Sequence, residues 1–319
     1  MLPKLDFLYF SPKSLKELKE ILDSFPGVKP CWLAGGTDLW VDLPKGKKKA
    51  ELIVDLKGLP GLDGIRIDSE MGGKHLKVGA ETTSEEIDVA DHLKKTSGVL
   101  RIGALCAIHR IERDPFILEK APALARAAAC LGSLQVRNRA TLGGNLANGA
   151  PTADTAAPLL ALDASLRIWS PEGERIIPAA KFWRGPGRVC LGEKEILLEI
   201  IIPCGSGCSA YLKQGPRQAM DIGILSASAR LRAEGGVIRE AAIALGGAGP
   251  VPLRCRGAEE RLLGERAAPE IFEAASKLAV KEANPRDSRR ASRAYRLELI
   301  PVLVERVLII AWKGQEAMA

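Results

Sequence analysis

The sequence predicts an α+β protein with two domains. Its 319 residues match the combined length of about two average domains. Residues 1–204 alternate short apolar runs typical of strands with segments of helical periodicity, whereas residues 205–319 read as three strands followed only by helices. The two patterns meet at Pro203–Gly207, a Pro-Cys-Gly-Ser-Gly break. We therefore expect domains at 1–204 and 205–319.

The first domain is expected to open with a β-α-β unit. Ser11-Pro12 has the form of a helix start, and leucines then recur at helical spacing up to Pro26-Gly27. Apolar runs at residues 31–34 and 52–56 predict buried strands on either side of a Gly-Gly turn. Further elements are expected as strands at 64–67 and 75–79, a helix from Ser84 to Leu93, and an alanine-rich helix at 115–131.

The remaining elements continue this pattern. After a polar segment at 135–139, residues 152–161 have helical character, and 166–169 and 196–202 read as strands. The second domain is expected to contain three antiparallel strands and a helical bundle. The strands are placed at 209–213, 222–233 and 237–245, and the helices at 259–263, 269–283 and 292–312.

Composition and cysteine usage exclude several classes of protein. Apolar residues make up 46% and charged residues 27%, with a mean hydropathy of +0.02, which is typical of a globular chain. No apolar stretch approaches the ~20 residues that cross a bilayer, and Asp6 interrupts the start of the chain before a signal sequence could form. Seven scattered cysteines without a two-residue spacer predict reduced thiols, no metal site and a cytoplasmic location.

The net charge of +7 does not indicate a nucleic-acid partner. The basic residues concentrate in two runs, Lys45–Lys49 and Arg286–Arg296, and only 4% of residues are aromatic. Base-stacking platforms need aromatic side chains, and no zinc-finger or RNP-like pattern accompanies either run. We interpret the runs as a solvated loop and a solvated or subunit-facing helix.

Two glycine pairs share one form. Ala34-Gly35-Gly36-Thr37-Asp38 and Thr141-Leu142-Gly143-Gly144-Asn145 each consist of an apolar residue, two glycines and a hydrogen-bonding side chain. Consecutive glycine N–H groups can converge on one phosphate oxygen, because no Cβ holds the ligand away. Neither segment matches G-x-G-x-x-G or the phosphate-binding G-x-x-x-x-G-K-[ST]. Two tight turns remain the plain alternative.

Asp154 comes after the second pair and admits two roles. The segment 145–154 is polar and rich in small residues, as expected where backbone and ligand lie close together. The Asp154 carboxylate could accept hydrogen bonds from ligand hydroxyls. It could equally cap the helix that comes next in the chain. Spacing leaves both roles open.

These motifs together resemble the FAD-binding subunit of the molybdenum hydroxylases. The family includes the medium subunits of carbon monoxide dehydrogenase and 4-hydroxybenzoyl-CoA reductase and the central part of xanthine dehydrogenase. The resemblance covers nearly the whole chain and implies a FAD-binding domain of the PCMH type, built of two α/β subdomains, before the smaller domain. Its markers are LAGGTDL (33–39), QVRNRATLGGNLAN (135–148), PTAD (151–154), YLKQGPRQAMD (211–221) and RASRAYR (290–296).

The resemblance implies a set of FAD-binding residues. Both glycine segments would hold the diphosphate, Asp154 would contact the sugar-alcohol chain, and Leu131 would line the adenine pocket. Leu197 would pack by the isoalloxazine, and Lys213 would lie near the flavin ring with Asp221 at the end of the same loop. The full set is Trp32, Leu33, Ala34, Gly35, Gly36, Thr37, Asp38, Leu39, Leu131, Thr141, Leu142, Gly143, Gly144, Asn145, Asp154, Leu197 and Lys213. A cation such as Lys213 would favour flavin reduction.

The implied function is that of an electron-transfer subunit in an oxidoreductase complex. Its partners would be a molybdenum-cofactor large subunit and a small subunit with two-iron clusters, assembled as a dimer of heterotrimers. The chain itself lacks the four clustered cysteines of the 4-hydroxybenzoyl-CoA reductase branch and needs no catalytic residue for the substrate. The alternatives are a free-standing FAD-dependent NAD(P)H oxidoreductase and a nucleotide-binding module without redox function.

Overall fold

The computed structural model describes residues 6–46, 49–68, 98–205, 207–217 and 219–318. It contains the α/β parts and the smaller strand-and-helix part that the sequence predicts, and the predicted fold class is confirmed. The expected strand at 75–79 and the expected helix from Ser84 lie outside the described residues. No described helix is both long enough and apolar enough to span a membrane.

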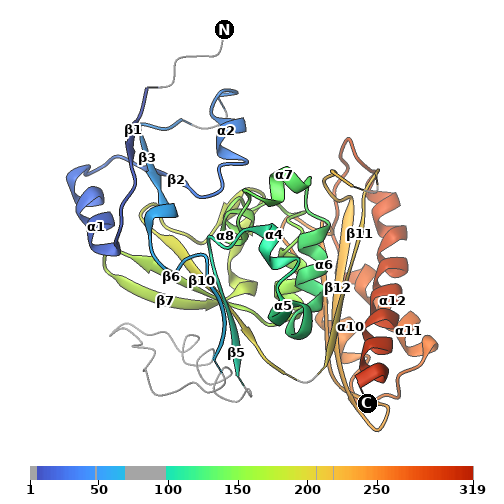
Figure 1. The fold of residues 1–319 in the computed structure, drawn as a ribbon. Helices are drawn as coiled ribbons and strands as arrows, with labels where there is room; N and C mark the ends of the chain where they lie inside the picture. The colour runs from blue at the N-terminus through green and yellow to red at the C-terminus, as the bar shows by residue number, and fades with distance from the viewer. Residues whose placement is uncertain (1–5, 47–48, 69–97, 206, 218, 319) are drawn as a thin grey trace.

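The first subdomain is a small parallel sheet with a helix packed on it (Figure 1). Strand β3 (Leu52–Asp55) lies between β1 (Leu8–Phe10) and β2 (Pro30–Leu33) and is buried along its length. Helix α1 (Leu15–Ser24) begins later than predicted. Its N-cap is Ser14, whose hydroxyl accepts from the Glu17 N–H at 3.1 Å, and not Ser11.

The second subdomain is a five-stranded antiparallel sheet in the order β4-β5-β10-β6-β7. Its central strand β10 (Ile196–Pro203) is buried at every position, which explains the continuous apolar run in the sequence. The other strands of this sheet are β4 (Ile65–Asp68), β5 (Val99–Gly103), β6 (Ser165–Ser170) and β7 (Gly173–Pro178). A small ribbon of β8 (Trp183–Gly185) and β9 (Arg188–Val189) comes next, and short 3-10 turns occupy Leu56–Gly58 and Ala179–Lys181.

A set of short helices lies between the five-stranded sheet and the C-terminal domain (Figure 1). The helix predicted at 115–131 is two helices, α5 (Pro115–Lys120) and α6 (Pro122–Ala129). The cause is Pro122, which has no N–H to continue the first helix and disfavours helical geometry at the residue before it. The other helices are α4 (Ile108–Ile111), α7 (Leu134–Arg137), α8 (Leu142–Ala147) and α9 (Ala156–Ala161). Helix α7 overlaps the polar segment 135–139, for which no element was predicted.

The C-terminal domain is an antiparallel sheet covered on both faces. Strands β11 (Cys208–Gln214), β12 (Leu225–Glu234) and β13 (Val237–Gly246) are joined by a two-residue fourth strand, β14 (Leu253–Arg254), which the sequence pattern did not predict. Figure 1 shows β11 and β12 between α6 on one side and α12 on the other. The helices are α10 (Arg256–Glu260), α11 (Pro269–Glu282) and α12 (Arg293–Met318).

Alternation along β13 divides the core. Ala242 and Ala244 belong to the core of the first domain, with Leu160 of α9, while Ile243 and Leu245 pack into the core with α11 and α12. Neighbouring residues of a strand point to opposite faces of the sheet, so one strand supplies both cores. The small alanine side chains allow α9 to approach the sheet closely.

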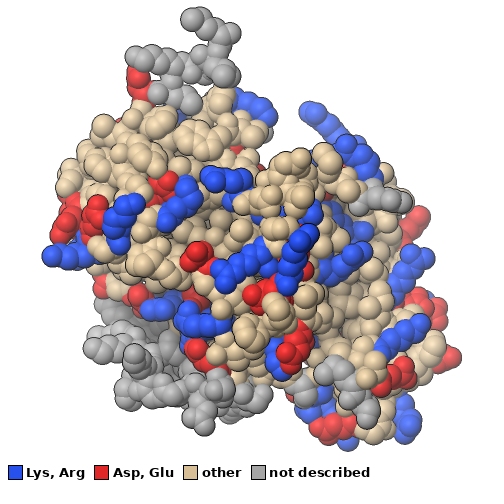
Figure 2. Space-filling view, in the orientation of Figure 1, with Lys and Arg blue, Asp and Glu red and all other residues tan. Residues whose placement is uncertain are grey.

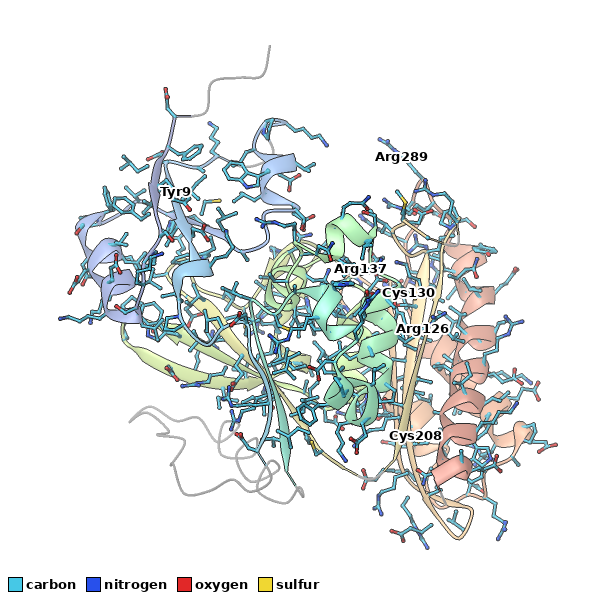
Figure 3. The ribbon with its side chains drawn as sticks, viewed as in Figure 1. Tyr9, Arg126, Cys130, Arg137, Cys208 and Arg289 are labelled. Carbon is cyan, nitrogen blue, oxygen red and sulfur yellow. The ribbon has the colours of Figure 1, made fainter. Side chains whose placement is uncertain are left out.

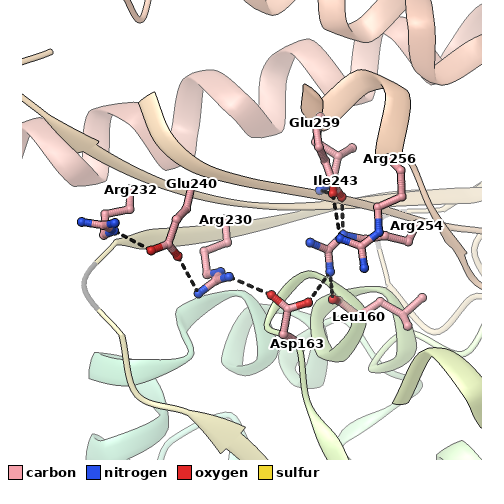
Figure 4. A network of polar contacts seen from close by, with 9 residues as sticks. All are labelled: Leu160, Asp163, Arg230, Arg232, Glu240, Ile243, Arg254, Arg256 and Glu259. Atoms are coloured by element: carbon pink, nitrogen blue, oxygen red, sulfur yellow. Dashed lines mark hydrogen bonds and ion pairs between the residues drawn. The ribbon is translucent and has the colours of Figure 1, made fainter. Parts of the chain in front are cut away.

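An ionic network also joins the domains (Figure 4). The Asp163 carboxylate, in the turn after α9, accepts from Arg230 at 2.8 Å and from Arg254 at 2.7 Å. Arg254 also donates to the Leu160 carbonyl at 2.6 Å and pairs with buried Glu259. Asp163 adopts a φ of 51°, a left-handed conformation that few residues other than glycine tolerate well. Two arginines of the C-terminal sheet thus hold one carboxylate of the first domain.

Candidate functional site

A cavity of about 1080 Å³ lies where the first subdomain, the short helices and the C-terminal domain meet. Its size is at the upper end of the ~300–1,000 Å³ typical of small-molecule sites. Figure 2 shows a notch in the upper edge of the molecule, with Lys and Arg side chains on both sides of it. The lining includes fourteen of the seventeen residues predicted to bind the ligand: Trp32, Ala34, Gly35, Gly36, Thr37, Asp38, Leu39, Leu131, Thr141, Gly143, Gly144, Asn145, Asp154 and Leu197.

Three predicted site residues do not line this cavity. Leu33 and Leu142 are buried in the packing beneath the two glycine segments. Lys213 lies behind the wall, with its side chain 9% exposed. The two leucines fix the segments that carry the glycines, and their own side chains face away from the cavity.

The first glycine pair comes directly after the carboxyl end of β2, the edge at which parallel sheets commonly bind ligands. Gly35 passes so close to the Arg139 carbonyl that a Cβ would lie 2.0 Å from its oxygen. Gly36 has a φ of 75° and sits against the Trp40 ring. Within the described residues, the N–H groups of Gly35, Gly36 and Thr37 donate to no protein acceptor. These three donors are available to an anionic ligand.

The second glycine pair is built differently. It forms the first turn of α8, and Thr141 caps that helix by accepting from the Gly144 N–H at 3.1 Å. The Gly143 N–H donates to the Ala104 carbonyl at 2.8 Å, and the Asn145 N–H to the Thr141 carbonyl at 2.9 Å. Contrary to the expectation of two converging sets of donors, the N–H groups of this segment already have protein acceptors, and the segment lines the cavity with glycine backbone.

Asp154 does not act as a helix cap. The N-cap of α9 is Thr155, and no side chain accepts a hydrogen bond there, so the capping alternative is wrong. The Asp154 carboxylate instead accepts from the Tyr211 hydroxyl at 2.8 Å and from Lys213 Nζ at 2.9 Å while lining the cavity. Burial raises the pKa of the Asp154 carboxyl above its ordinary value, and the Lys213 charge and the two hydrogen bonds offset only part of that effect.

A polar cluster of Tyr9, Asp55 and Lys57 supports the first glycine pair. Asp55, at the end of β3, accepts from the Tyr9 hydroxyl and from Lys57 Nζ, each at 2.7 Å. Lys57 also donates to the Ala34 carbonyl at 3.2 Å. Burial alone would raise the pKa of the Asp55 carboxyl, but the hydrogen bonds from Lys57 and Tyr9 outweigh burial and hold its pKa below the ordinary value. The cluster fixes the residue that precedes Gly35.

The segment around Leu131 is held by arginine. Arg137 donates to the Leu131 carbonyl at 3.2 Å and lies 2.8 Å from the Glu112 carboxylate, which is also 2.7 Å from His109. Figure 3 shows Arg137 on α7 beside Cys130, the C-cap of α6. Leu131 itself is 8% exposed and presents an apolar surface to the cavity.

Sequence reasoning missed part of the wall. Met220 and Ile222 of the C-terminal domain line the cavity, as Asp221 does, and Met220 is 62% exposed with a φ of 59°. Cys31 of β2 and Val136 of α7 also line it. The signal for residues 220–222 was their place at the end of YLKQGPRQAMD (211–221) and directly after it. Cys31 and Val136 carried no signal, because isolated apolar residues in a strand or helix look like ordinary core.

The described residues show no metal centre. No group of three or more His, Cys, Asp or Glu side chains among them could hold an ion. The seven cysteines form no disulfide. Burial raises the pKa of the Cys106 thiol to about 12, which keeps it protonated and unreactive at neutral pH. This thiol therefore contributes to the packing of the first domain's core.

Comparison with known proteins identifies the family of the chain. Residues 5–97 and 85–205 match the family model described as the FAD-binding domain in molybdopterin dehydrogenase, and residues 210–311 match the CO dehydrogenase flavoprotein C-terminal domain. The chain belongs to this flavoprotein family. The family assignment made from the sequence motifs is confirmed, as is FAD as the cofactor.

Relatives of this flavoprotein cover almost its full length. The putative xanthine dehydrogenase FAD-binding subunit of Escherichia coli is 34% identical over 94% of each chain. The nicotinate dehydrogenase FAD-subunit of Eubacterium barkeri is 31% identical over 84% of this chain and 83% of its own. A solved carbon monoxide dehydrogenase from Hydrogenophaga pseudoflava superimposes with a TM-score of 0.83 at 28% identity, covering 98% of this chain and 99% of the other.

The residues of the flavoprotein cavity fit FAD. The three backbone donors at the first glycine pair suit a diphosphate, the second pair lines the cavity with backbone that carries no side chain, and the Asp154 carboxylate suits hydroxyl donors. Leu131 and Leu197 supply apolar wall on two sides of the cavity. Each chemical part of FAD therefore has a matching group in the cavity lining.

Proposed function

We propose that the chain is the FAD-carrying electron-transfer subunit of a multi-subunit molybdenum-dependent dehydrogenase. The observation that carries this is the 1080 Å³ cavity, whose wall combines the first glycine pair, Asp154 and residues 220–222 in a chain of the flavoprotein family. Bound FAD would exchange single electrons with an iron–sulfur centre and pairs of electrons with an external acceptor. Relatives named as FAD or medium subunits support this function over both alternatives.

The residues of the chain bind and orient FAD and do not act on the substrate of the complex. In the proposal, Gly35, Gly36 and Thr37 donate to the diphosphate, and Asp154 accepts from the sugar-alcohol hydroxyls. Leu131 packs by the adenine and Leu197 by the flavin ring. No histidine or cysteine lies in either glycine pair, so we expect the FAD to be held without a covalent link.

The proposed partners are a large molybdenum-cofactor subunit and a small subunit with two-iron clusters, in a dimer of heterotrimers. Large apolar side chains are exposed on the elements that border the cavity: Trp40 and Val41 on the short helix α2 (Leu39–Asp42), Leu134 on α7, and Met220 and Ile222. Apolar side chains gathered in one place on a surface are typical of an interaction site. They support a partner docked at the cavity mouth.

The proposed location is the cytoplasm.

The test is reconstitution. The purified chain loaded with FAD is expected to pass electrons at most from a nicotinamide donor to an artificial dye. Substrate turnover is expected only after the iron–sulfur and molybdenum subunits are added. Turnover of the substrate by the chain alone would contradict the proposal and favour a free-standing enzyme, and a purified chain that neither contains nor binds flavin would favour a module without redox function.

A further inference from the structure

Lys213 makes three hydrogen bonds through its ammonium group. Its Nζ donates to Asp154 Oδ2 at 2.9 Å, to the Cys130 carbonyl at 3.0 Å and to the Asp221 carbonyl at 2.9 Å. An ammonium group has three donors, so all three are used. The side chain is 9% exposed and does not line the cavity. This geometry differs from that of a cation directed at a flavin ring.

The three acceptors belong to three separate segments. Cys130 ends α6 and Asp154 precedes α9, both in the first domain, whereas Asp221 belongs to the C-terminal domain. Asp154 and Asp221 line the cavity. Lys213, on β11, therefore connects two parts of the cavity wall that come from different domains.

Tyr211 completes the arrangement around Asp154. Residues 211 and 213 lie two apart on β11 and so point to the same face of the sheet. The Tyr211 hydroxyl donates to Oδ1 of Asp154 while Lys213 donates to Oδ2. Together the two hydrogen bonds fix the orientation of the carboxylate plane. Each carboxylate oxygen keeps acceptor capacity for a ligand in the cavity.

We propose that Lys213 is a positioning residue: it orients the Asp154 carboxylate as an acceptor at the cavity wall and ties residues 220–222 to that carboxylate, joining the two domains across the FAD site. This inference rests on the proposed function for the identity of the ligand. It assigns Lys213 an effect on FAD binding through Asp154 and residues 220–222, in place of direct action on the flavin ring.

The charge of Lys213 has a consequence for Asp154. Lys213 is the only ion-pair partner of the buried Asp154 carboxylate among the described residues. Without that charge, burial favours the protonated form of Asp154 still more strongly. A protonated carboxyl presents a hydroxyl donor where the ligand needs an acceptor. FAD affinity should then depend on pH, improving as rising pH ionises Asp154.

The experiment compares FAD dissociation constants of full-length variants by fluorescence titration between pH 6 and 9. Lys213→Met is expected to weaken binding about tenfold at pH 7, with affinity recovering as the pH rises, while the unmodified protein stays nearly constant over this range. Lys213→Arg is expected to restore a flat profile, because it keeps the charge. Lys281→Met, an exposed lysine on α11, is the matched control and should change nothing.

Two further variants assign the pH effect. The groups facing Asp154 are Lys213 and Tyr211 from β11 and Cys130 from the end of α6, whose thiol pKa burial raises. Adding Asp154→Asn to Lys213→Met should abolish the pH dependence, whereas adding Cys130→Ser should leave it in place. If Lys213→Met proves insoluble, Lys213→Gln takes its place in every measurement.

Hydrogen exchange supplies a readout that does not require FAD. Backbone amides of residues 220–222 should exchange at least fivefold faster in Lys213→Met than in the Lys281→Met control. A flat pH profile with affinity within twofold of the unmodified protein, or unchanged exchange at 220–222, would overturn the positioning role. Failure of the unmodified protein to bind FAD would instead contradict the proposed function, and hydrogen exchange would still test the connection.

Discussion

The two glycine pairs look alike in sequence but differ in the hydrogen bonding of their backbone N–H groups. At Gly35-Gly36 the backbone runs free after a parallel strand, and its N–H groups have no acceptor within the described residues. At Gly143-Gly144 the same dipeptide begins a helix, and its N–H groups donate to Ala104 and Thr141. The same pair of residues thus offers hydrogen-bond donors to a ligand at the first position. At the second position it offers only backbone that carries no side chain.

The residues flanking a glycine pair determine whether its N–H groups have protein acceptors. Thr141, two residues before Gly143, caps a helix and accepts from the Gly144 N–H, which is therefore not free to bind a ligand. Asp38, two residues after Gly36, begins the short α2 (Leu39–Asp42) without a side-chain hydrogen bond at its cap. Substitutions at both pairs and at the residues that support them test this contrast.

The largest effect is expected from valine at Gly35 or Gly143. A Cβ at Gly35 would lie 2.0 Å from the Arg139 oxygen, and one at Gly143 would lie 2.7 Å from the Ala104 Cβ. Relieving such contacts should cost about 3 kcal/mol of unfolding free energy in each variant. The backbone shift that relieves them should also weaken FAD binding. Urea unfolding and FAD titration measure both effects. Variants that fold normally and keep full flavin affinity would remove both pairs from the site.

Asp154→Ala should have the next largest effect, and it acts on binding. The N–H groups of residues 142–145 already have protein acceptors, so the contribution of this region to FAD should come mainly from the carboxylate. Loss of a buried acceptor is expected to weaken FAD by about 1–3 kcal/mol. Titration of the soluble variant measures this. Unchanged affinity with a lower melting temperature would show that the carboxylate serves only to join Tyr211 and Lys213.

A matched pair of threonine variants should separate the two segments. Thr141→Val removes a helix cap and should lower the unfolding free energy by about 1 kcal/mol with little change in FAD affinity. Thr37→Val changes a half-buried residue of the cavity without a protein hydrogen bond in the described structure, so it should leave stability unchanged. Calorimetry and FAD titration on both variants test the contrast. Equal losses of stability would contradict it.

The smallest effect is expected in the pH dependence of the stability that Asp55 contributes beside the first glycine pair. The folded-state pKa of Asp55 lies below its unfolded value, so ionised Asp55 stabilises the fold above the unfolded pKa of about 3.9. That stabilisation is lost as the pH falls through the folded pKa. Melting temperatures of the unmodified protein and Asp55→Asn should therefore converge as the pH falls below about 4. Parallel curves would mean that the polar cluster carries no net ionic stabilisation.

The sequence predicted the order of elements and the place of the site better than the local hydrogen bonding. Periodicity located β10 and the long C-terminal helices, because strong apolar patterns reflect burial. It placed the first helix start at Ser11 when Ser14 is the cap, and it merged α5 with α6 across Pro122. Family resemblance brought Lys213 close to the site but could not show that its donors face Asp154, Cys130 and Asp221. The contacts with Asp154 and Cys130 join segments far apart in the chain, which spacing does not reveal.

The Asp163 network has a consequence for how the protein melts and how it can be divided (Figure 4). Asp163 needs Arg230 and Arg254 as counterions, and the alanine face of β13 completes the core beside α9. A fragment ending at residue 204 would expose that apolar face and leave the carboxylate without these two arginines. We therefore expect the two domains to unfold in a single cooperative calorimetric transition, and the isolated first domain to aggregate when produced alone.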